Sequence, residues 1–189
     1  SMNVLAGERL FNAELPLAIA YSKSSYNMDK DAQTWEILQT SIGQGTTQMS
    51  PMHNAMLTAA IANGGTLMKP YFIDRVESVA DEEVKKFLPE AYGNILTAQE
   101  AELLAGLMCL VVTEGTGSAV RTDAYTVAAK TGSAEFDTGK ETHAWFTGYA
   151  PAENPQLIVT VIVEESGSGG QVAAPVARSI FDRYFAGSR

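Results

Sequence analysis

A lysine, a glycine and two hydroxyl-bearing residues stand together at the end of a short apolar run. The stretch AAKTGSAEF, residues 128–136, contains Lys130, Thr131, Gly132 and Ser133 in succession. Because side chains alternate along a strand, Lys130 and Gly132 would point to one face and Thr131 to the other. The glycine would let a ligand approach the backbone closely, and Ser133 offers a hydroxyl and a backbone N–H. A cation beside such donors suits an anion or a developing oxyanion.

The tetrapeptide alone is a weak signal, because a solvated edge lysine followed by an ordinary turn is its more common explanation. The two histidines do not add a catalytic base. His143 stands near Trp145 at a strand start, and His53 lies in a predicted helix, so we expect structural roles for both. The stretches GTGSAV and SGSGG lack the Gly-Lys-Ser/Thr ending of a phosphate-binding loop, and we interpret both as turns. No metal site is evident.

Aromatic and acidic residues near the predicted strands have two possible readings each. Trp145, Phe146 and Tyr149 would line the floor of a cleft or belong to the core, and the core is the more common place for aromatic residues of a central strand. Glu164 and Glu165 follow a predicted strand and precede a glycine-rich loop. We expect them on a solvated rim rather than in an acid–base pair.

Two helices are predicted between residues 50 and 118. Ser50 is a suitable N-cap and Pro51 suits the first helical position, which predicts a buried helix over 51–63 that stops at Asn63-Gly64-Gly65. Thr97 and Glu100 have capping-box spacing and predict a second helix over 97–113. Its expected buried face consists of Leu103, Leu104, Leu107, Met108 and Val111.

The remaining chain predicts an antiparallel sheet and a terminal helix. Strands are expected over 124–131, 144–150 and 156–164, and the connections between them are too short for crossover helices. A helix over 173–185 should lie on one face of this sheet. Its expected contact stripe is Val172, Val176, Ile180 and Tyr184, widened by Phe181 and Phe185. The fold class is therefore α+β.

Composition limits the possible partners and compartments. Thirteen basic against twenty-two acidic residues give a net charge of −9, and the basic residues are scattered, which makes nucleic acid an unsuitable partner. The single cysteine, Cys109, cannot form an internal disulfide and leaves the redox compartment open. The 189 residues suffice for one globular core, and we expect one domain, with residues 12–34 as irregular surface loop.

The order of several motifs along the chain resembles the C-terminal portion of the penicillin-binding protein transpeptidase domain. The segments are SIGQGTTQMSPMHNAMLTAAIANGGTLMKPY, AAKTGSAEF, HAWFTGYAP, LIVTVIVEE and GGQVAAPVARSIF, and the resemblance runs from about Phe11 to Phe185. It implies a serine acyl-transfer enzyme of the β-lactamase/transpeptidase-like fold that works on peptidoglycan, with Lys130, Thr131 and Gly132 as its K-T-G signature.

The resemblance also implies roles for the signature residues. Lys130 would give the cleft positive charge, the Ser133 hydroxyl would hold a substrate or β-lactam carboxylate, and the Ser133 N–H would form half of an oxyanion hole. The catalytic residues implied are therefore Lys130 and Ser133, with Thr131, Gly132 and Ser133 binding the substrate. A peptidoglycan stem peptide would lie along the strand in a strand-like pairing. No cofactor is implied.

The chain departs from the family pattern at the nucleophile. No serine here has a lysine three residues later, so the S-x-x-K motif is absent. Ser25-Tyr26-Asn27 has S-x-N spacing but stands too close to SIGQG, and we interpret it as a chance match. We expect the chain to be a part of a longer transpeptidase and inactive alone. The alternative is a non-catalytic homologue that binds peptidoglycan or a partner.

The chain is expected to consist of three parts and to bind a small set of partners. Residues 1–49 should be an irregular lead-in, residues 50–118 a helical part, and residues 119–189 the sheet and terminal helix. Stem peptides and, in a complete domain, β-lactams are the expected ligands. The parent protein would lie on the extracytoplasmic face of the bacterial cell membrane, with this part itself soluble. The strand at 156–164 would normally pair on its far side with missing strands, so we expect self-association there.

Overall fold

A three-stranded antiparallel sheet forms the centre of the molecule. The computed structural model describes residues 2–15 and 20–187. The strands are β5 (Ala128–Ala134), β6 (His143–Ala150) and β7 (Leu157–Val163), in the order β5-β6-β7. Thr131 lies opposite Phe146, and Phe146 lies opposite Val161. The predicted antiparallel sheet and the α+β class are confirmed.

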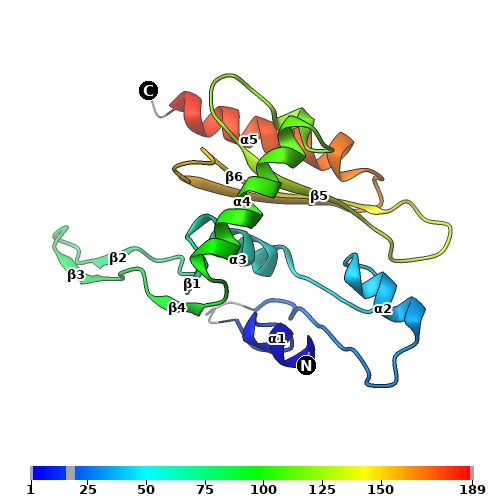
Figure 1. Ribbon diagram of the computed structural model, residues 1–189. Helices are drawn as coiled ribbons and strands as arrows, with labels where there is room; N and C mark the ends of the chain where they lie inside the picture. Colours follow the sequence, from blue (N-terminus) through cyan, green and yellow to red (C-terminus); the bar gives the residue numbers. More distant parts are fainter. Residues whose placement is uncertain (1, 16–19, 188–189) are drawn as a thin grey trace.

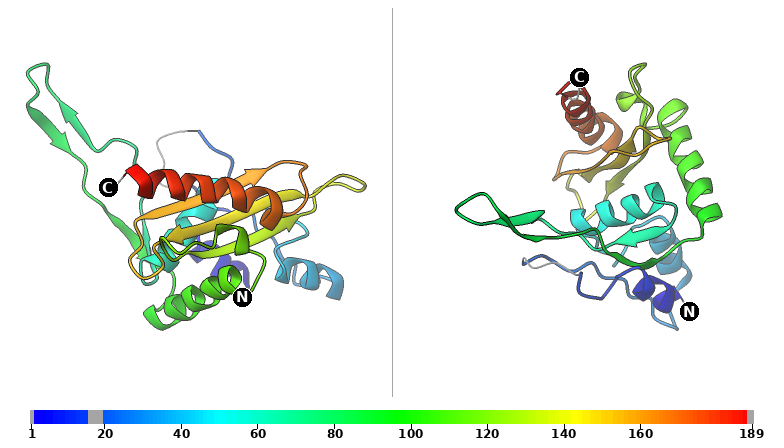
Figure 2. Two further views of the ribbon diagram at one scale, coloured as in Figure 1. Left: turned by 90° about the horizontal axis from the view of Figure 1, so that it is seen from above. Right: turned by 90° about the vertical axis from the view of Figure 1, so that its left-hand side faces the viewer.

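Helices cover both faces of this sheet (Figures 1 and 2). One face carries the helix α5 (Ala174–Gly187), preceded by a π-helical turn, η2 (Gly169–Ala173). The opposite face carries α3 (Pro51–Ala62), while α4 (Ala98–Thr113) packs beside β5. Two clusters result. The first, under α5, contains Val112, Val120, Val127, Ala129, Ala144, Phe146, Ala150, Val159, Ala173, Ala174, Ala177 and Phe181; the second, on the α3 side, contains Met108, Ala128 and Tyr149.

The predicted starts of α3 and α4 are confirmed by their caps. The Ser50 hydroxyl accepts a hydrogen bond from the His53 N–H at 3.3 Å. The Thr97 hydroxyl accepts from the Glu100 N–H at 3.2 Å, and the Glu100 carboxylate accepts from the Thr97 N–H at 2.8 Å. These reciprocal bonds satisfy backbone donors that the first turn would otherwise leave open.

The first predicted strand of the sheet is displaced along the chain. The prediction was 124–131, whereas β5 begins at Ala128 and continues through the signature to Ala134. The segment before Ala128 is held by side chains instead of a ladder. The Tyr125 hydroxyl donates to Asp182 of α5 at 2.6 Å, and the Thr126 hydroxyl accepts from the Ala152 N–H at 2.9 Å. Side-chain bonds to α5 and to the β6–β7 turn therefore replace strand pairing there.

The predicted buried stripes of the two long helices are confirmed in part. In α5 the residues buried against the sheet are Ala174, Ala177 and Phe181. The predicted Val176, Ile180 and Tyr184 are exposed, at 41–45%. In α4, Ala101, Met108 and Val112 are buried, whereas Leu103 and Leu107 are exposed. Of the predicted side chains, Phe181 and Met108 are buried, and Val172 and Phe185 pack against the core cluster. Alanines supply further close contacts in both helices, so the other large side chains did not mark the contact face.

Within the lead-in, residues 1 and 16–19 lie outside the described residues, and residues 2–15 and 20–49 are less irregular than expected. They contain α1 (Met2–Glu8) and α2 (Thr34–Ser41), which were not predicted, and Ser25 forms an isolated antiparallel bridge with Gln48. A third cluster joins this lead-in to α3 and to the segment that contains Leu67; its buried members are Leu10, Leu15, Met56, Ala60 and Leu67. The remaining loop character of residues 20–33 agrees with the prediction.

Residues 50–118 also contain strands that were not predicted. β1 (Thr66–Met68) pairs with β4 (Ala91–Asn94), and β2 (Arg75–Glu77) pairs with β3 (Glu83–Lys86). The β2–β3 hairpin projects from the body of the molecule (Figure 2). All residues of β2 and β3 are exposed, which explains why hydrophobic alternation did not reveal them. A 3₁₀ turn, η1 (Ser118–Val120), follows α4.

His53 has the structural role expected of it. It is fully buried on α3, its Nε2 lies 2.7 Å from the Arg9 carbonyl oxygen, and its ring lies 4.8 Å from the Phe11 ring. Burial lowers the pKa of His53, while the Arg9 carbonyl opposes that shift. Across residues 2–15 and 20–187 no helix combines the length and apolar character needed to cross a membrane.

Candidate functional site

A groove of about 630 Å³ lies beside the signature strand. One wall is the loop 42–49 between α2 and α3, and the other is residues 130–136 of β5 and its continuation. Side chains of β6 contribute to the surface between them. The lining includes Gln44, Gln48, Asn54, Lys130, Thr131, Gly132, Ser133, Glu135, Phe136, His143, Trp145 and Thr147. The four residues that the sequence singled out therefore border one groove.

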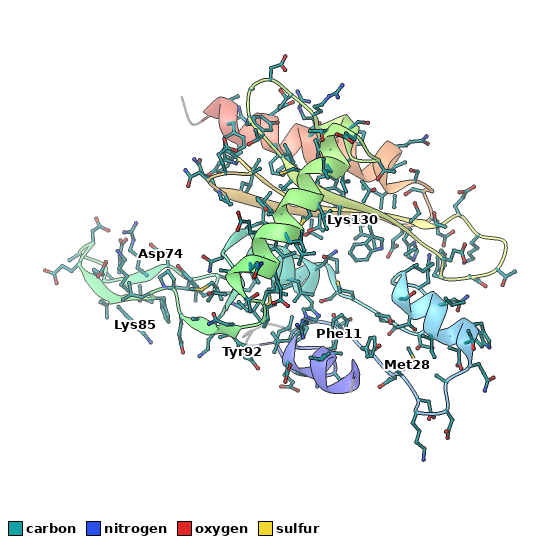
Figure 3. The ribbon with its side chains drawn as sticks, in the orientation of Figure 1. Phe11, Met28, Asp74, Lys85, Tyr92 and Lys130 are labelled. Atoms are coloured by element: carbon teal, nitrogen blue, oxygen red, sulfur yellow. The ribbon has the colours of Figure 1, made fainter. Side chains whose placement is uncertain are left out.

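Lys130 supplies the positive charge of this groove. It is exposed, it lies on β5 on the side of the sheet that faces α2 and α3, and its ammonium donates to the Thr131 carbonyl oxygen (Figure 3). Lys130 pairs across the ladder with Thr147, whose side chain shares its face. Among the described residues that line the groove, Lys130 and Glu135 carry the formal charges. An anionic group would therefore be attracted to the Lys130 end.

Thr131 is fixed from the opposite face of the sheet. Its side chain is buried, and its hydroxyl lies 2.5 Å from the Thr116 hydroxyl. Thr116 belongs to GTGSAV, which forms the expected turn after α4. Thr131 thus reaches the groove through its backbone, and its hydroxyl holds the strand in place. The contact with substrate expected of Thr131 would therefore be made by its backbone groups and not by its hydroxyl.

Ser133 is exposed and keeps a free proton to donate. Its hydroxyl oxygen accepts a hydrogen bond from the Gly169 N–H at 3.4 Å. A serine hydroxyl that accepts one bond can still donate its own hydrogen. Because backbone groups alternate sides along a ladder, the Ser133 N–H points to the free edge of β5, away from β6. By side-chain alternation the hydroxyl lies on the face of Thr131 and η2, at the exposed rim of the groove, whereas the N–H lies on the free edge itself.

The glycine pair of SGSGG is a packing element, and its interpretation as a turn is wrong for these two residues. Gly169 is buried and starts η2, and a Cβ there would overlap backbone atoms of Gly132 and Trp145. A Cβ on Gly170 would overlap the Thr116 carbonyl oxygen. The segment before α5 therefore lies directly on the backbone of the signature strand, and only glycine permits that approach.

Gln44 is a groove residue that the sequence reasoning did not single out. Its Nε2 donates to the Ser133 carbonyl oxygen at 3.0 Å, and its Oε1 accepts from the Glu135 N–H at 3.2 Å. The sequence signal that could have pointed to Gln44 was its place between two glycines. Both glycines, Gly43 and Gly45, have a positive φ, of 79° and 77°. A polar residue between two such glycines is held in a specific loop conformation.

The other candidates divide between core and groove. Phe146 and Tyr149 are fully buried, as expected, while Trp145 is half-buried and lines the groove. His143 stacks on Phe136 with ring centroids 4.0 Å apart. The His143 Nδ1 accepts from the Glu165 N–H at 3.1 Å, so this nitrogen is unavailable as a base. His143 lies opposite Ala134, where the β5–β6 loop enters β6.

The acidic candidates and the chance motif lie outside the site chemistry. Glu164 and Glu165 are exposed, and Glu165 forms an ion pair with Lys140 at 3.5 Å, as a solvated rim would. Ser25 and Asn27 do not line the groove. In the described part of the chain no three His, Cys, Asp or Glu side chains cluster in a way that could hold a metal ion.

A family comparison agrees with this fold. Residues 10–182 match the family described as the penicillin-binding protein transpeptidase domain. The chain belongs to this family.

Curated transpeptidase relatives match over most of the chain. The peptidoglycan D,D-transpeptidase PbpA of Mycolicibacterium smegmatis is 32% identical over 175 residues, which cover 87% of this chain and 34% of the relative. The peptidoglycan D,D-transpeptidase MrdA of Haemophilus influenzae is 34% identical over 168 residues, which cover 79% and 26%. The chain thus spans about a third or less of the length of these relatives.

Solved transpeptidase structures share the fold. The D,D-transpeptidase domain of a peptidoglycan glycosyltransferase from Eggerthella lenta superposes with a TM-score of 0.89 at 25% identity, over 99% of this chain and 48% of that one. Penicillin-binding protein A from M. tuberculosis, as an imipenem acyl-enzyme complex, superposes with a TM-score of 0.85 at 26% identity, over 96% and 41%.

Proposed function

We propose that this chain supplies the K-T-G wall of a serine D,D-transpeptidase that cross-links peptidoglycan stem peptides and is acylated by β-lactams. The observation that carries the proposal is the common groove of Lys130, Gly132 and Ser133 beside a free strand edge. The relatives PbpA and MrdA carry the name of this activity, and the M. tuberculosis homologue was captured as an acyl-enzyme with imipenem.

The groove residues would act by binding and charge stabilisation. The Lys130 ammonium would attract the carboxylate of a stem peptide or β-lactam, and the Ser133 hydroxyl would donate a hydrogen bond to it. The Ser133 N–H, on the free edge, would stabilise the oxyanion that forms when a serine attacks the acyl carbonyl. A side chain at Gly132 would stand on the groove face beside Trp145, so glycine keeps that approach open.

The nucleophile of the proposed enzyme lies outside residues 1–189, because no serine of this sequence belongs to an S-x-x-K motif. The test is labelling with a fluorescent penicillin, applied to residues 1–189 and to the product of the complete gene. Residues 1–189 should remain unlabelled, and the complete product should be labelled on the serine of an S-x-x-K motif. Lys130→Ala in the complete product should slow labelling by about 100-fold or more.

Two outcomes would contradict the proposal. A penicillin adduct on a serine within residues 1–189 would show that the nucleophile has been misplaced. A complete gene product without S-x-x-K, and without labelling, would favour the non-catalytic module that binds peptidoglycan or a partner. The absence of the motif from these residues is the observation that keeps this second function in view.

The proposed substrate places the complete protein on the extracytoplasmic face of the bacterial cell membrane, where peptidoglycan is assembled. A membrane-impermeant amine-reactive label applied to intact cells tests this location. Labelling equal to that of an outer-face marker is expected, and protection equal to that of a cytoplasmic marker would refute it.

Self-association of the chain through β7 is a further part of the proposal. β7 pairs with β6 on one side, and no other strand of the described residues pairs with it. Its sequence LIVTVIV is apolar and β-branched. An unpaired edge of this kind recruits another strand. A second copy of the chain, or strands of the complete protein, would cover it.

A further inference from the structure

The backbone groups on the free edge of β5 differ in whether they already have a hydrogen-bond partner. By ladder alternation, Lys130, Gly132 and Ala134 face β6, whereas Thr131 and Ser133 present their N–H and C=O groups to the groove. The Thr131 carbonyl already accepts from the Lys130 ammonium. An extended ligand that pairs with this edge must use the remaining groups.

The side-chain amide of Gln44 bonds the end of this edge in place of the backbone of a neighbouring strand. Its amide donates to the Ser133 carbonyl and accepts from the Glu135 N–H, at 3.0 and 3.2 Å. One residue of a parallel neighbouring strand bonds residues i and i+2 of its partner in the same way, and an antiparallel strand would need the same two edge groups for two of its residues. The Ser133 N–H, between the two occupied carbonyls of Thr131 and Ser133, stays open on the edge.

The backbone of the loop fixes the position of Gln44. Its N–H donates to the Gln39 carbonyl at 2.9 Å, and the Gly43 N–H donates to the Thr40 carbonyl at 3.0 Å, which anchors the loop on the end of α2. Gly43 and Gly45 have φ of 79° and 77°, a conformation that favours glycine. Two glycines with positive φ on either side of one half-buried glutamine indicate a loop whose shape directs that side chain.

We propose that Gln44 is a positioning residue that ends the peptide-pairing edge of β5. An extended peptide would pair with the edge as far as Ser133 and no farther, because Gln44 already holds the Glu135 N–H. The next residue of the peptide would have to turn away from the strand at Gln44. This inference rests on the proposed function, since it assumes that a peptide binds along β5.

The first arm of the test measures amide hydrogen exchange in residues 1–189 without any ligand. Gln44→Ala should speed exchange of the Glu135 N–H by about 5-fold or more, the value of one ordinary hydrogen bond, while the melting temperature of the chain stays unchanged. Gln48→Ala is the matched control, because the Gln48 side chain lines the same groove and the bonds of Gln48 at this point are made by its backbone. Unaltered Glu135 exchange in Gln44→Ala would overturn the capping role.

The second arm compares two peptides, acetyl-L-lysyl-D-alanyl-D-alanine and the same peptide extended by two residues at its amino end. In antiparallel pairing that extension reaches Glu135. The unsubstituted chain should bind both within about 2-fold, and Gln44→Ala should bind the longer peptide about 5-fold more tightly. Gln44→Glu, which keeps the acceptor for the Glu135 N–H, should behave like the unsubstituted chain toward the extension.

The outcomes separate the inference from the proposed function. If both peptides bind and their ratio does not depend on Gln44, the positioning role is wrong and the groove function stands. If neither peptide binds to any variant, peptide pairing along β5 is wrong, and both proposals fall, whatever the exchange rate of Glu135.

Discussion

Gly169 lies against Gly132: a Cβ built on Gly169 would overlap the carbonyl oxygen of Gly132. The two residues are separated along the chain by the whole β5–β6–β7 meander. Their contact therefore presses the turn before α5 onto the signature strand from the face opposite Lys130. The geometry of the groove depends on this contact, since it fixes the plane of the strand that carries the donors.

The first prediction concerns this contact. Gly169→Ala should lower the free energy of unfolding by about 1–3 kcal/mol, because backbone atoms rather than a flexible side chain must move to admit the methyl group. Urea unfolding measures the change. Gly106→Ala is the control, since a Cβ at Gly106 in α4 meets nothing within 4 Å and should stabilise the helix by about 0.5–1 kcal/mol. Equal effects of the two substitutions would contradict the packing argument.

A chain of buried hydroxyls beneath the groove gives a second prediction. Thr58 donates to the Asn54 carbonyl at 2.9 Å, and the hydroxyls of Thr147 and Thr160 continue the chain at 2.7 and 2.8 Å. Thr147→Val removes the middle link and should cost about 1–3 kcal/mol, because Thr160 loses its bond to the Thr147 hydroxyl and Thr58 keeps only its bond to the Asn54 carbonyl. Thr147→Ser keeps the hydroxyl and should cost less in the same unfolding experiment. A neutral Thr147→Val would show that the chain contributes nothing.

His53 predicts how stability depends on pH. Its ordinary pKa is 6.5, and burial lowers the pKa in the folded chain. Between these two values the unfolded chain binds a proton that the folded chain resists, so stability is retained above about pH 7 and is lost as the pH falls below 6.5. Urea midpoints measured from about pH 7.5 to 5.5 should decline, and the decline should be smaller in His53→Gln. An identical slope in His53→Gln and in the control His143→Gln would contradict this assignment.

The free edge of β7 predicts concentration-dependent assembly. Light scattering of residues 1–189 across a concentration series should show a mass above that of the 20.2 kDa chain, and the mass should rise with concentration. Ile162→Pro should weaken the association, because by alternation its N–H points to the free edge and is not used by the β6–β7 ladder. The circular dichroism of this variant must remain that of the folded chain. A strict monomer at every concentration would refute the edge argument.

The sheet and its signature strand could be predicted because local patterns were strong there. β7 is a continuous β-branched run, and the caps Ser50 and Thr97 place two helices almost to the residue. The start of β5 was misplaced because Tyr125 and Thr126 have strand-forming side chains that are used instead to bond α5 and the β6–β7 turn. Tertiary bonds of that kind are not visible in a local sequence window.

The contact faces of the helices and the role of Gln44 could not be predicted for a different reason. Close packing of α5 uses Ala174 and Ala177, whose small size lets the helix approach the sheet, while Ile180 remains exposed. Hydrophobicity alone ranks these residues in the opposite order. Gln44 becomes significant only when the edge of β5 lies beside it, about ninety residues later in the sequence.

The projecting β2–β3 hairpin is a site where a protease could cut the chain or where a segment could be inserted. Its tip includes Val79, which is completely exposed, and Asp81, which has a positive φ. Asp74 directly precedes β2, and Lys85 lies in β3 (Figure 3). The strands β1 and β4 remain paired at its base. A protease should therefore cut first near Val79, and the two pieces should stay together until the chain is denatured. The same tip would accept an inserted tag or fluorophore while the groove, built from other segments, keeps its shape.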